Sequence, residues 1–262
     1  MKFGELMKVH KPDLVISKRY DAWVQKNSNP VYSEEALRFG VEALAAQATP
    51  RDRRGTVSAS SSGKCMRRQQ FTYIGMPEML FSAKTSAILQ NGTFMHIRWQ
   101  MAGLTEGFIR EAEVPVPRNN SLKLSGTMDA IAYDGSIIEL KSANSGSFGR
   151  VVTFNEPLHG HDMQLGTYMM VTGAEKGVLL YENKDTQEYK EIVITADQVQ
   201  TVMITRKLEE LWQEISIERL AEPLGAAYEA KAPCSTCPFR DNCLLVKDWD
   251  HAKEIADAHR EG

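Results

Sequence analysis

The apolar and polar residues of this chain repeat with two different periods, and the changes between them predict the order of its elements. Residues 34–47 and about 82–102 repeat apolar side chains at helical spacing, whereas residues 108–142 alternate with a period of two between turn signals. Further helices are predicted at about 158–171 and 196–220, with the strands GVLLYE and YKEIVIT between them. This order predicts an α/β (α+β) fold in which helices flank a mixed central sheet.

Two predicted helices have recognisable ends. Ser33 is suited to cap the first, whose apolar positions are Leu37, Val41, Leu44 and Ala45. A second is expected to start at Ser58 or Ser60, to run through Cys65, and to end before Gly75.

The segment SGTMDAIAYDGSIIELKS, residues 125–142, carries three charged residues within predicted hydrophobic strand. A two-residue turn would put Asp129 on the apolar face, where an unpaired buried carboxylate is costly. A three-residue loop, with Gly135 in the left-handed conformation, instead places Asp129 opposite Glu139 and puts Lys141 on the same face. We therefore predict the three-residue loop.

Two carboxylates facing one another across a strand pair repel unless a cation lies between them. Mg²⁺ or Mn²⁺ prefers oxygen ligands and accepts one carboxylate from each strand. From the spacing alone the alternative remains open that this is a solvent-exposed face on which Glu139 and Lys141 form an ordinary ion pair.

Composition sets wider limits. The chain has 262 residues, of which 42% are hydrophobic and 25% charged, with a net charge of -3, so it is long enough for one large domain and is not strongly basic overall. No long apolar run or secretory leader is evident, which predicts a cytoplasmic protein without a membrane partner. The basic residues concentrate in residues 51–68, namely Arg51, Arg53, Arg54, Lys64, Arg67 and Arg68.

In a reducing compartment, cysteines are more often thiols or metal ligands than disulfides. CSTCPFRDNC contains Cys234, Cys237 and Cys243, and the fourth cysteine, Cys65, is far away in sequence. Four thiolates suit a 4Fe-4S cluster or a tetrahedral zinc ion, and the spacing does not choose between them. Either group would join the N- and C-terminal parts of the chain.

Several motifs together resemble one family. Asp129 with Glu139-Leu140-Lys141 resembles the signature of the PD-(D/E)xK nuclease superfamily. Its RecB-like exonucleases have motifs similar to NGTFMH, HDMQLGTY and VSASSSGKCMRR of this chain. One early cysteine followed by a CxxCx₅C cluster resembles their iron-sulfur branch, to which CRISPR-associated adaptation nucleases and helicase-nuclease subunits belong.

The resemblance implies a restriction-endonuclease-like core over residues 57–247, a helical N-terminal extension over 1–56 and a C-terminal tail over 248–262. It implies that Asp129, Glu139 and Lys141 are catalytic and that Mg²⁺ or Mn²⁺ is held by His96, Asp129, Glu139 and the backbone carbonyl of Leu140. The remaining roles implied are iron-sulfur ligation by Cys65, Cys234, Cys237 and Cys243, DNA contact by Arg67, Arg68, Gln164 and Tyr168, and an accessory acid at Glu113.

The expected function is therefore a metal-dependent DNA exonuclease that acts on single strands or DNA ends in recombination, repair, or phage or CRISPR DNA processing. One alternative is a structure-specific endonuclease. A second is the nuclease subunit of a helicase or recombination complex, because the chain has no GxxxxGK(S/T) phosphate loop of its own. A third is an inactive cluster-containing DNA-binding module, against which the intact Asp129, Glu139 and Lys141 argue.

Overall fold

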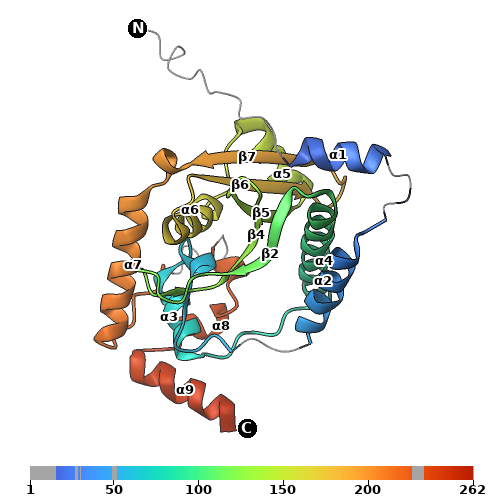
Figure 1. The fold of residues 1–262 in the computed structure, drawn as a ribbon. Helices are drawn as coiled ribbons and strands as arrows, with labels where there is room; N and C mark the ends of the chain where they lie inside the picture. Colours follow the sequence, from blue (N-terminus) through green and yellow to red (C-terminus); the bar gives the residue numbers. More distant parts are fainter. Residues whose placement is uncertain (1–15, 27–28, 30, 49–51, 226–232, 262) are drawn as a thin grey trace.

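The computed structural model describes residues 16–26, 29, 31–48, 52–225 and 233–261 (Figure 1). Residues 1–15 of the expected N-terminal extension and Arg51 of the basic segment lie outside the described residues.

A five-stranded mixed sheet forms the centre of the fold. Its strands lie in the order β2 (Ile109–Pro115), β4 (Thr127–Ala132), β5 (Ile137–Ala143), β6 (Lys176–Asn183) and β7 (Tyr189–Thr195). β5 and β6 are parallel, and the other neighbours are antiparallel. β1 (Val57–Ser58) and β3 (Leu124–Ser125) form a separate short parallel pair.

Helices cover both faces of this sheet, which confirms the predicted fold class. On one face, α1 (Ser17–Lys26) and α4 (Ala83–Glu106) contribute Trp23 and Trp99 to a core with Ile138 of β5. On the other face, α6 (His161–Thr172) and α7 (Thr201–Ser216) contribute Leu165 and Leu208 to a second core. Figure 1 shows α4 on one side of the strands and α6 with α7 on the other.

Both faces of β5 are therefore buried, as is usual for a strand with a parallel neighbour and helices on both sides. Of the five residues predicted on the apolar face of the hairpin, Ala130, Ala132, Ile138 and Leu140 belong to the core with Trp99. The fifth, Met128, is a correction, because it packs in the second core. The opposite face is buried as well, since Ile137 is 1% exposed and packs in the second core.

The helix α2 (Glu34–Ala46) forms where it was predicted, with Ser33 Oγ accepting a hydrogen bond from Ala36 N. Its buried face differs from the one that its large apolar residues indicate. Ala36 and Gly40 are buried, because their small size lets α2 approach α4: a Cβ on Gly40 would lie 2.6 Å from Met101 Sδ. The larger apolar side chains of Leu37, Val41 and Leu44 are exposed instead.

The helix predicted from Ser58 or Ser60 is divided into two parts. Ser58 caps the 3-10 turn η1 (Ala59–Ser61), and α3 (Met66–Ile74) starts directly after Cys65 and ends at Gly75, whose φ is +87°. A second 3-10 turn, η2 (Ala196–Gln198), precedes α7.

Two helices were not predicted. The first, α5 (Ser145–Phe154), follows β5, and the second, α9 (Trp249–Glu261), occupies the expected tail. Trp249, Ala252 and Ala256 of α9 are buried. Before α9 come η4 (Cys234–Thr236) and the short α8 (Arg240–Cys243). No helix within the described ranges combines the length and the apolar character that crossing a membrane requires.

Candidate active site

The β4–β5 hairpin has the predicted register. Ala130 pairs with Ile138 and Ile131 with Ile137, and continuing this register places Asp129 opposite Glu139. Ala132 N donates to Ser136 O over 2.9 Å, and Gly135 between them has a φ of +83°. The three-residue loop with a left-handed glycine is therefore confirmed.

Asp129 uses both carboxylate oxygens. Oδ2 accepts a hydrogen bond from the backbone N–H of Leu140 over 2.7 Å, and Oδ1 lies 3.3 Å from Nδ1 of His96 on α4. Burial raises the pKa of Asp129, but the charges of His96 and Lys141 and the Leu140 N–H outweigh burial and lower the pKa below its ordinary value. The carboxylate is thus held ionised between a strand and a helix.

Glu139 is only 2% exposed, which excludes a solvent-exposed charged face. Its Oε1 accepts hydrogen bonds from Lys141 Nζ and from Gln164 Nε2, each over 2.5 Å. Its Oε2 is buried and has no hydrogen-bond partner among the described residues. Burial and then the neighbouring charge of Asp129 raise the pKa of Glu139 to about 7. An unpaired buried oxygen of this kind is a position that a cation would stabilise.

Lys141 and Gln164 complete a closed arrangement with Glu139. Lys141 Nζ donates to Gln164 Oε1 over 3.0 Å in addition to its ion pair with Glu139. The amide of Gln164 therefore acts as donor to the carboxylate and as acceptor from the ammonium group.

Glu113 adds a third carboxylate to the same row. The register of β2 with β4, in which Ala112 pairs with Ala130 and Val114 with Met128, places Glu113 opposite Asp129. Its φ of +51° is unusual for a residue other than glycine. Glu113, Asp129 and Glu139 thus follow one another across three adjacent strands.

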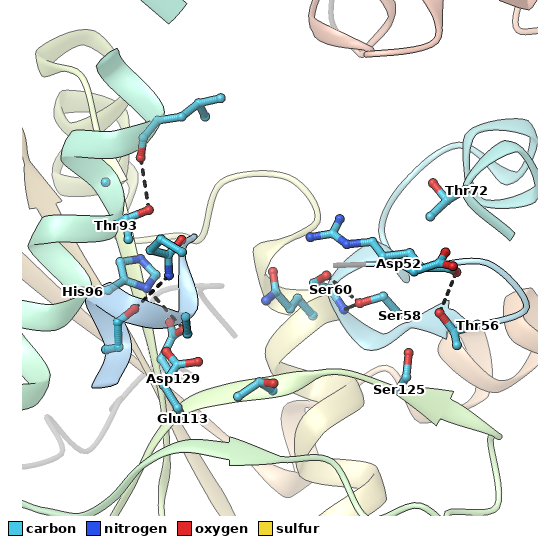
Figure 2. Close-up of a pocket in the computed structure, with 18 of the residues that line it drawn as sticks. Asp52, Thr56, Ser58, Ser60, Thr72, Thr93, His96, Glu113, Ser125 and Asp129 are labelled. Atoms are coloured by element: carbon cyan, nitrogen blue, oxygen red, sulfur yellow. Dashed lines mark hydrogen bonds and ion pairs between the residues drawn. The ribbon is translucent and has the colours of Figure 1, made fainter. Parts of the chain in front are cut away.

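Gln100 is a residue that sequence reasoning missed. It is fully buried, and its Nε2 donates to Glu113 Oε1 over 3.0 Å and to the Asp129 carbonyl over 2.7 Å. The one available signal was its position four residues after His96, on the same face of the helix. Figure 2 shows His96, Asp129 and Glu113 together at one side of a cavity.

This cavity has a volume of about 1710 Å³, and Asp129, Glu139, Lys141 and Gln164 lie on its wall. Across it from His96 and Asp129 lie Ser58, Ser60, Thr56 and Thr72 (Figure 2). The volume exceeds the roughly 300–1,000 Å³ typical of pockets for one small molecule. The row of carboxylates is therefore open to a ligand larger than a single small molecule.

The residues expected to contact DNA are placed differently from one another. Arg67 is a correction: it is 3% exposed and donates to the carbonyls of Ala221, Cys243 and Val246, so its guanidinium is not available to phosphates. Arg68, by contrast, is partly exposed.

The two α6 residues that were expected to contact DNA, Gln164 and Tyr168, form hydrogen bonds within the protein. Tyr168 is 1% exposed, and its hydroxyl donates to the Thr127 carbonyl over 3.0 Å. Gln164 lines the cavity, but both ends of its amide are used by Glu139 and Lys141. In this structure both side chains form hydrogen bonds to other residues of the site and do not project into the cavity as free DNA-binding groups.

All four cysteines lie in the described part of the chain, and none forms a disulfide. Burial raises the pKa of the Cys243 thiol, the charge and hydrogen bond of Arg67 lower it, and the neighbouring thiols of Cys65 and Cys237 raise it further. Because these thiols interact electrostatically, the three cysteines lie near one another. The N- and C-terminal parts are linked by an apolar cluster, in which Phe71 packs against Phe239, and by hydrogen bonds. Besides those of Arg67, Gln70 donates to the Arg219 carbonyl and accepts from Ala221 N, both over 2.8 Å.

In the described residues no group of three or more His, Cys, Asp or Glu side chains is arranged so that it could hold a metal ion. A cluster on the cysteines is accordingly not shown. A magnesium ion needs fewer protein ligands, since it is commonly bound by one or two carboxylates together with water and phosphate oxygens. Asp129 and Glu139, with the unpartnered Oε2 of Glu139, fit this donor set.

Comparison with solved structures finds matches at low identity. An alkaline exonuclease (LHK-Exo) from Laribacter hongkongensis is 17% identical with a TM-score of 0.48, covering 68% of this chain and 93% of that chain. LHK-Exo in complex with dAMP is 19% identical with a TM-score of 0.52, covering 63% and 90%. SSO0001 is 22% identical with a TM-score of 0.49, covering 81% and 97%.

None of the curated proteins compared with this chain matches it. The likeness to the dAMP complex indicates a shared fold. A family model gives the assignment, because it matches residues 35–244, from α2 to the end of the cysteine-containing segment. The chain belongs to the PD-(D/E)XK nuclease superfamily.

Proposed function

We propose that this chain is a Mg²⁺- or Mn²⁺-dependent deoxyribonuclease that hydrolyses phosphodiester bonds. The observation that carries the proposal is the pair of carboxylates, Asp129 and Glu139, which face one another on adjacent strands beside the ammonium group of Lys141. The pair lies on the wall of a large cavity, and one buried oxygen of Glu139 has no partner among the described residues.

The two carboxylates Asp129 and Glu139 would hold the metal, and we propose His96 and the backbone carbonyl of Leu140 as further ligands that would complete its coordination on binding. When bound there, the ion supplies Lewis acidity toward the phosphate and lowers the pKa of a water ligand. His96 and Asp129 already lie 3.3 Å apart through Nδ1 and Oδ1, so the two donors converge on one side of the site.

The chain's own residues prepare the site before substrate arrives. Lys141 presents a positive charge at the cavity wall, where it stabilises the negative charge that develops on a phosphate under attack. Glu139 and Gln164 hold this ammonium group in place, and Gln100 ties Glu113 to the backbone of β4. A preformed arrangement of this kind costs little reorganisation during the reaction.

The test is cleavage of a linear, end-labelled single strand with Mg²⁺ or Mn²⁺. Asp129→Ala should abolish cleavage, and Lys141→Ala should lower the rate by at least about a hundredfold, with unchanged circular dichroism. Glu111→Gln is the matched control, because Glu111 lies two residues from Glu113 on β2 but is exposed. Wild-type rates in both site variants would refute the assignment.

For the mode of attack we propose exonuclease action on single-stranded DNA or DNA ends, with roles in recombination, repair, or phage or CRISPR DNA processing. The fold shared with LHK-Exo in its complex with dAMP supports this choice, since LHK-Exo is an alkaline exonuclease. A structure-specific endonuclease is the second candidate, since the same carboxylates serve both reactions. A circular single strand separates the two, because an exonuclease leaves it intact.

The purified chain also distinguishes an enzyme that acts alone from a subunit and from an inactive binding module. Cleavage without ATP or a helicase partner would show that it acts alone, whereas activity restored by a partner would indicate a subunit of a larger complex. DNA binding without any cleavage would support an inactive binding module.

We further propose that Cys65, Cys234, Cys237 and Cys243 bind a 4Fe-4S cluster in a reducing cytoplasm. The shared neighbourhood of Cys65, Cys237 and Cys243 supports this. Anaerobic purification should give a coloured protein whose iron and sulfide contents match a thiolate-bound iron-sulfur cluster. A colourless protein containing zinc would replace the cluster by a tetrahedral zinc ion and leave the nuclease proposal unaffected.

A further inference from the structure

One face of α2 forms part of the cavity wall. Phe39, Ala43 and Ala46 line it together with Glu42 and Gln47, at the spacing that puts residues on one side of a helix. This face is distinct from the exposed stripe of Leu37, Val41 and Leu44, none of which lines the cavity.

The adjacent wall from α4 continues this surface toward the carboxylates. Leu89, which is 53% exposed, lies nearest the start of the helix, followed by Gly92, Thr93 and His96. Among the described residues of α2 and α4 that line the cavity there is no lysine or arginine. Apart from the acid Glu42 near its far end and His96 beside the carboxylates, this side offers an aromatic ring, aliphatic groups and neutral polar side chains, with no lysine or arginine in its described part to bind a phosphate.

The opposite side has the reverse character. Arg53, Arg54, His259 and Arg260 line the cavity there and are exposed; Arg54 pairs with Asp52 and Arg260 with Asp257. Figure 2 shows Asp52 and Thr72 across from Thr93 and His96, and Figure 1 shows α9 apart from α2 and α4. The C-terminal helix thus supplies two of the basic side chains of the cavity, a role that its sequence position did not suggest.

We propose that the two walls bind the two sides of one DNA strand: the α2–α4 wall receives bases, with Phe39 stacking on one of them, and the Arg53–Arg260 wall receives phosphates. This deepens the proposed function and rests on it. A single strand has free base faces on one side of its backbone, and aromatic side chains bind such faces with little sequence preference. A duplex covers its bases and presents phosphates on both flanks, which does not match one wall without lysine or arginine and one basic wall.

The experiment measures binding of a fluorescent oligodeoxythymidylate and of an abasic strand of equal length, in chelator and in a Lys141→Ala background, so that neither strand is cut. Phe39→Ala should weaken binding of the thymidylate strand about tenfold, which is about 1.4 kcal/mol, as expected for losing one base–aromatic stack. Binding of the abasic strand should stay within twofold, and Phe39→Tyr should restore thymidylate binding.

Two further variants keep the test decisive. Val41→Ala is the matched control, because Val41 is an exposed apolar residue of the same helix outside the cavity. Leu89→Ser changes an exposed side chain of the wall, so it tests the same surface if Phe39→Ala folds poorly; it too should weaken thymidylate binding and spare the abasic strand. Equal losses on both strands, or no loss in either variant, would overturn the proposal.

The outcome is separable from that of the nuclease proposal. If the α2–α4 wall does not bind bases but the chain is a nuclease, the otherwise wild-type protein cleaves DNA while Phe39→Ala binds both strands normally. If the chain does not cleave DNA, base-dependent binding is still measured directly, since this assay needs no catalysis.

Discussion

The Gln164 side chain of α6 binds Glu139 and Lys141 at the same time. Its Nε2 donates to Glu139 Oε1 over 2.5 Å, while its Oε1 accepts from Lys141 Nζ over 3.0 Å. Because one atom must donate and the other must accept, an amide meets both requirements, whereas a carboxylate or a hydrocarbon does not. The helix therefore fixes the relative positions of the two side chains that the proposed reaction uses.

Gln164→Leu should lower the cleavage rate about a hundredfold, since a small misplacement of catalytic groups has an effect of this size. Steady-state rates on a labelled single strand measure this. Thr167→Val is the control, because Thr167 is equally buried on α6 but donates only to Met163 of its own helix. A Gln164→Leu enzyme as fast as the wild type would remove Gln164 from a positioning role.

Glu139→Gln should stabilise the metal-free protein while it abolishes cleavage. The carboxylate is buried with Oε2 unpartnered among the described residues, and burial raises its pKa to about 7, so its charged form is unfavourable in the fold. At a pH above about 7, where the wild-type carboxyl must ionise, the amide keeps an acceptor for Lys141 and Gln164 without the charge. This should raise the free energy of unfolding by about 1–3 kcal/mol, and the gain should disappear as the pH falls well below about 7.

Thermal unfolding in chelator, and again with Mg²⁺, measures this effect. Mg²⁺ should raise the Tm of the wild type and have little effect on the variant, because a ligand stabilises the state that binds it. A variant that is less stable than the wild type in chelator would contradict this account of Glu139.

The hairpin could be predicted from the sequence because its evidence is local. Alternation of apolar residues, the position of Gly135 and the cost of burying Asp129 alone together select one register. The same reasoning treated the face with Asp129 and Glu139 as potentially solvent-exposed, since a single strand pair does not reveal whether a helix will cover it. Gln164 supplies that cover from 25 residues further along the chain.

Other features depend on contacts between distant segments or on small residues. Periodicity located α2 but indicated the wrong face, since close packing on α4 favours Ala36 and Gly40 over the larger apolar residues. In α9, two of the three buried anchors are alanines, which give a weak hydrophobic signal. The local sequence around Gln100 is that of an ordinary helix, and its role depends on β2 and β4, which place Glu113 and the Asp129 carbonyl within hydrogen-bonding distance of its side chain.

Gly135→Ala should destabilise the protein by about 1 kcal/mol and reduce cleavage, because the loop holds this residue at a φ of +83°. No atom lies within 4 Å of a Cβ placed there, so the cost comes from the backbone conformation and not from a clash. A loop that relaxed to a shorter turn would move Asp129 away from its position opposite Glu139.

Gly149→Ala provides the matched control. It also has open space around a Cβ, but it lies within α5, where alanine is the better helix former. This variant should be as stable as the wild type or slightly more so, with an unchanged cleavage rate. Urea unfolding and rate measurements on both variants test the contrast, and equal behaviour of the two would argue against the conformational role of Gly135.

Arg67 and Arg68 should separate stability from DNA binding, although they are neighbours in the basic segment. Arg67→Ala removes a buried guanidinium and leaves the carbonyls of Ala221, Cys243 and Val246 without their donor, so it should cost about 3 kcal/mol or more. Arg68→Ala changes a partly exposed side chain and should alter stability by less than about 0.5 kcal/mol.

The DNA-binding result should be the reverse. If Arg68 contacts a phosphate, Arg68→Ala should lower the slope of log affinity against log salt by about 0.7 on single strands, the value for one lost contact. At temperatures where Arg67→Ala is still folded, that variant should keep the wild-type slope. A reduced slope in Arg67→Ala would mean that its guanidinium leaves the buried carbonyls when DNA binds.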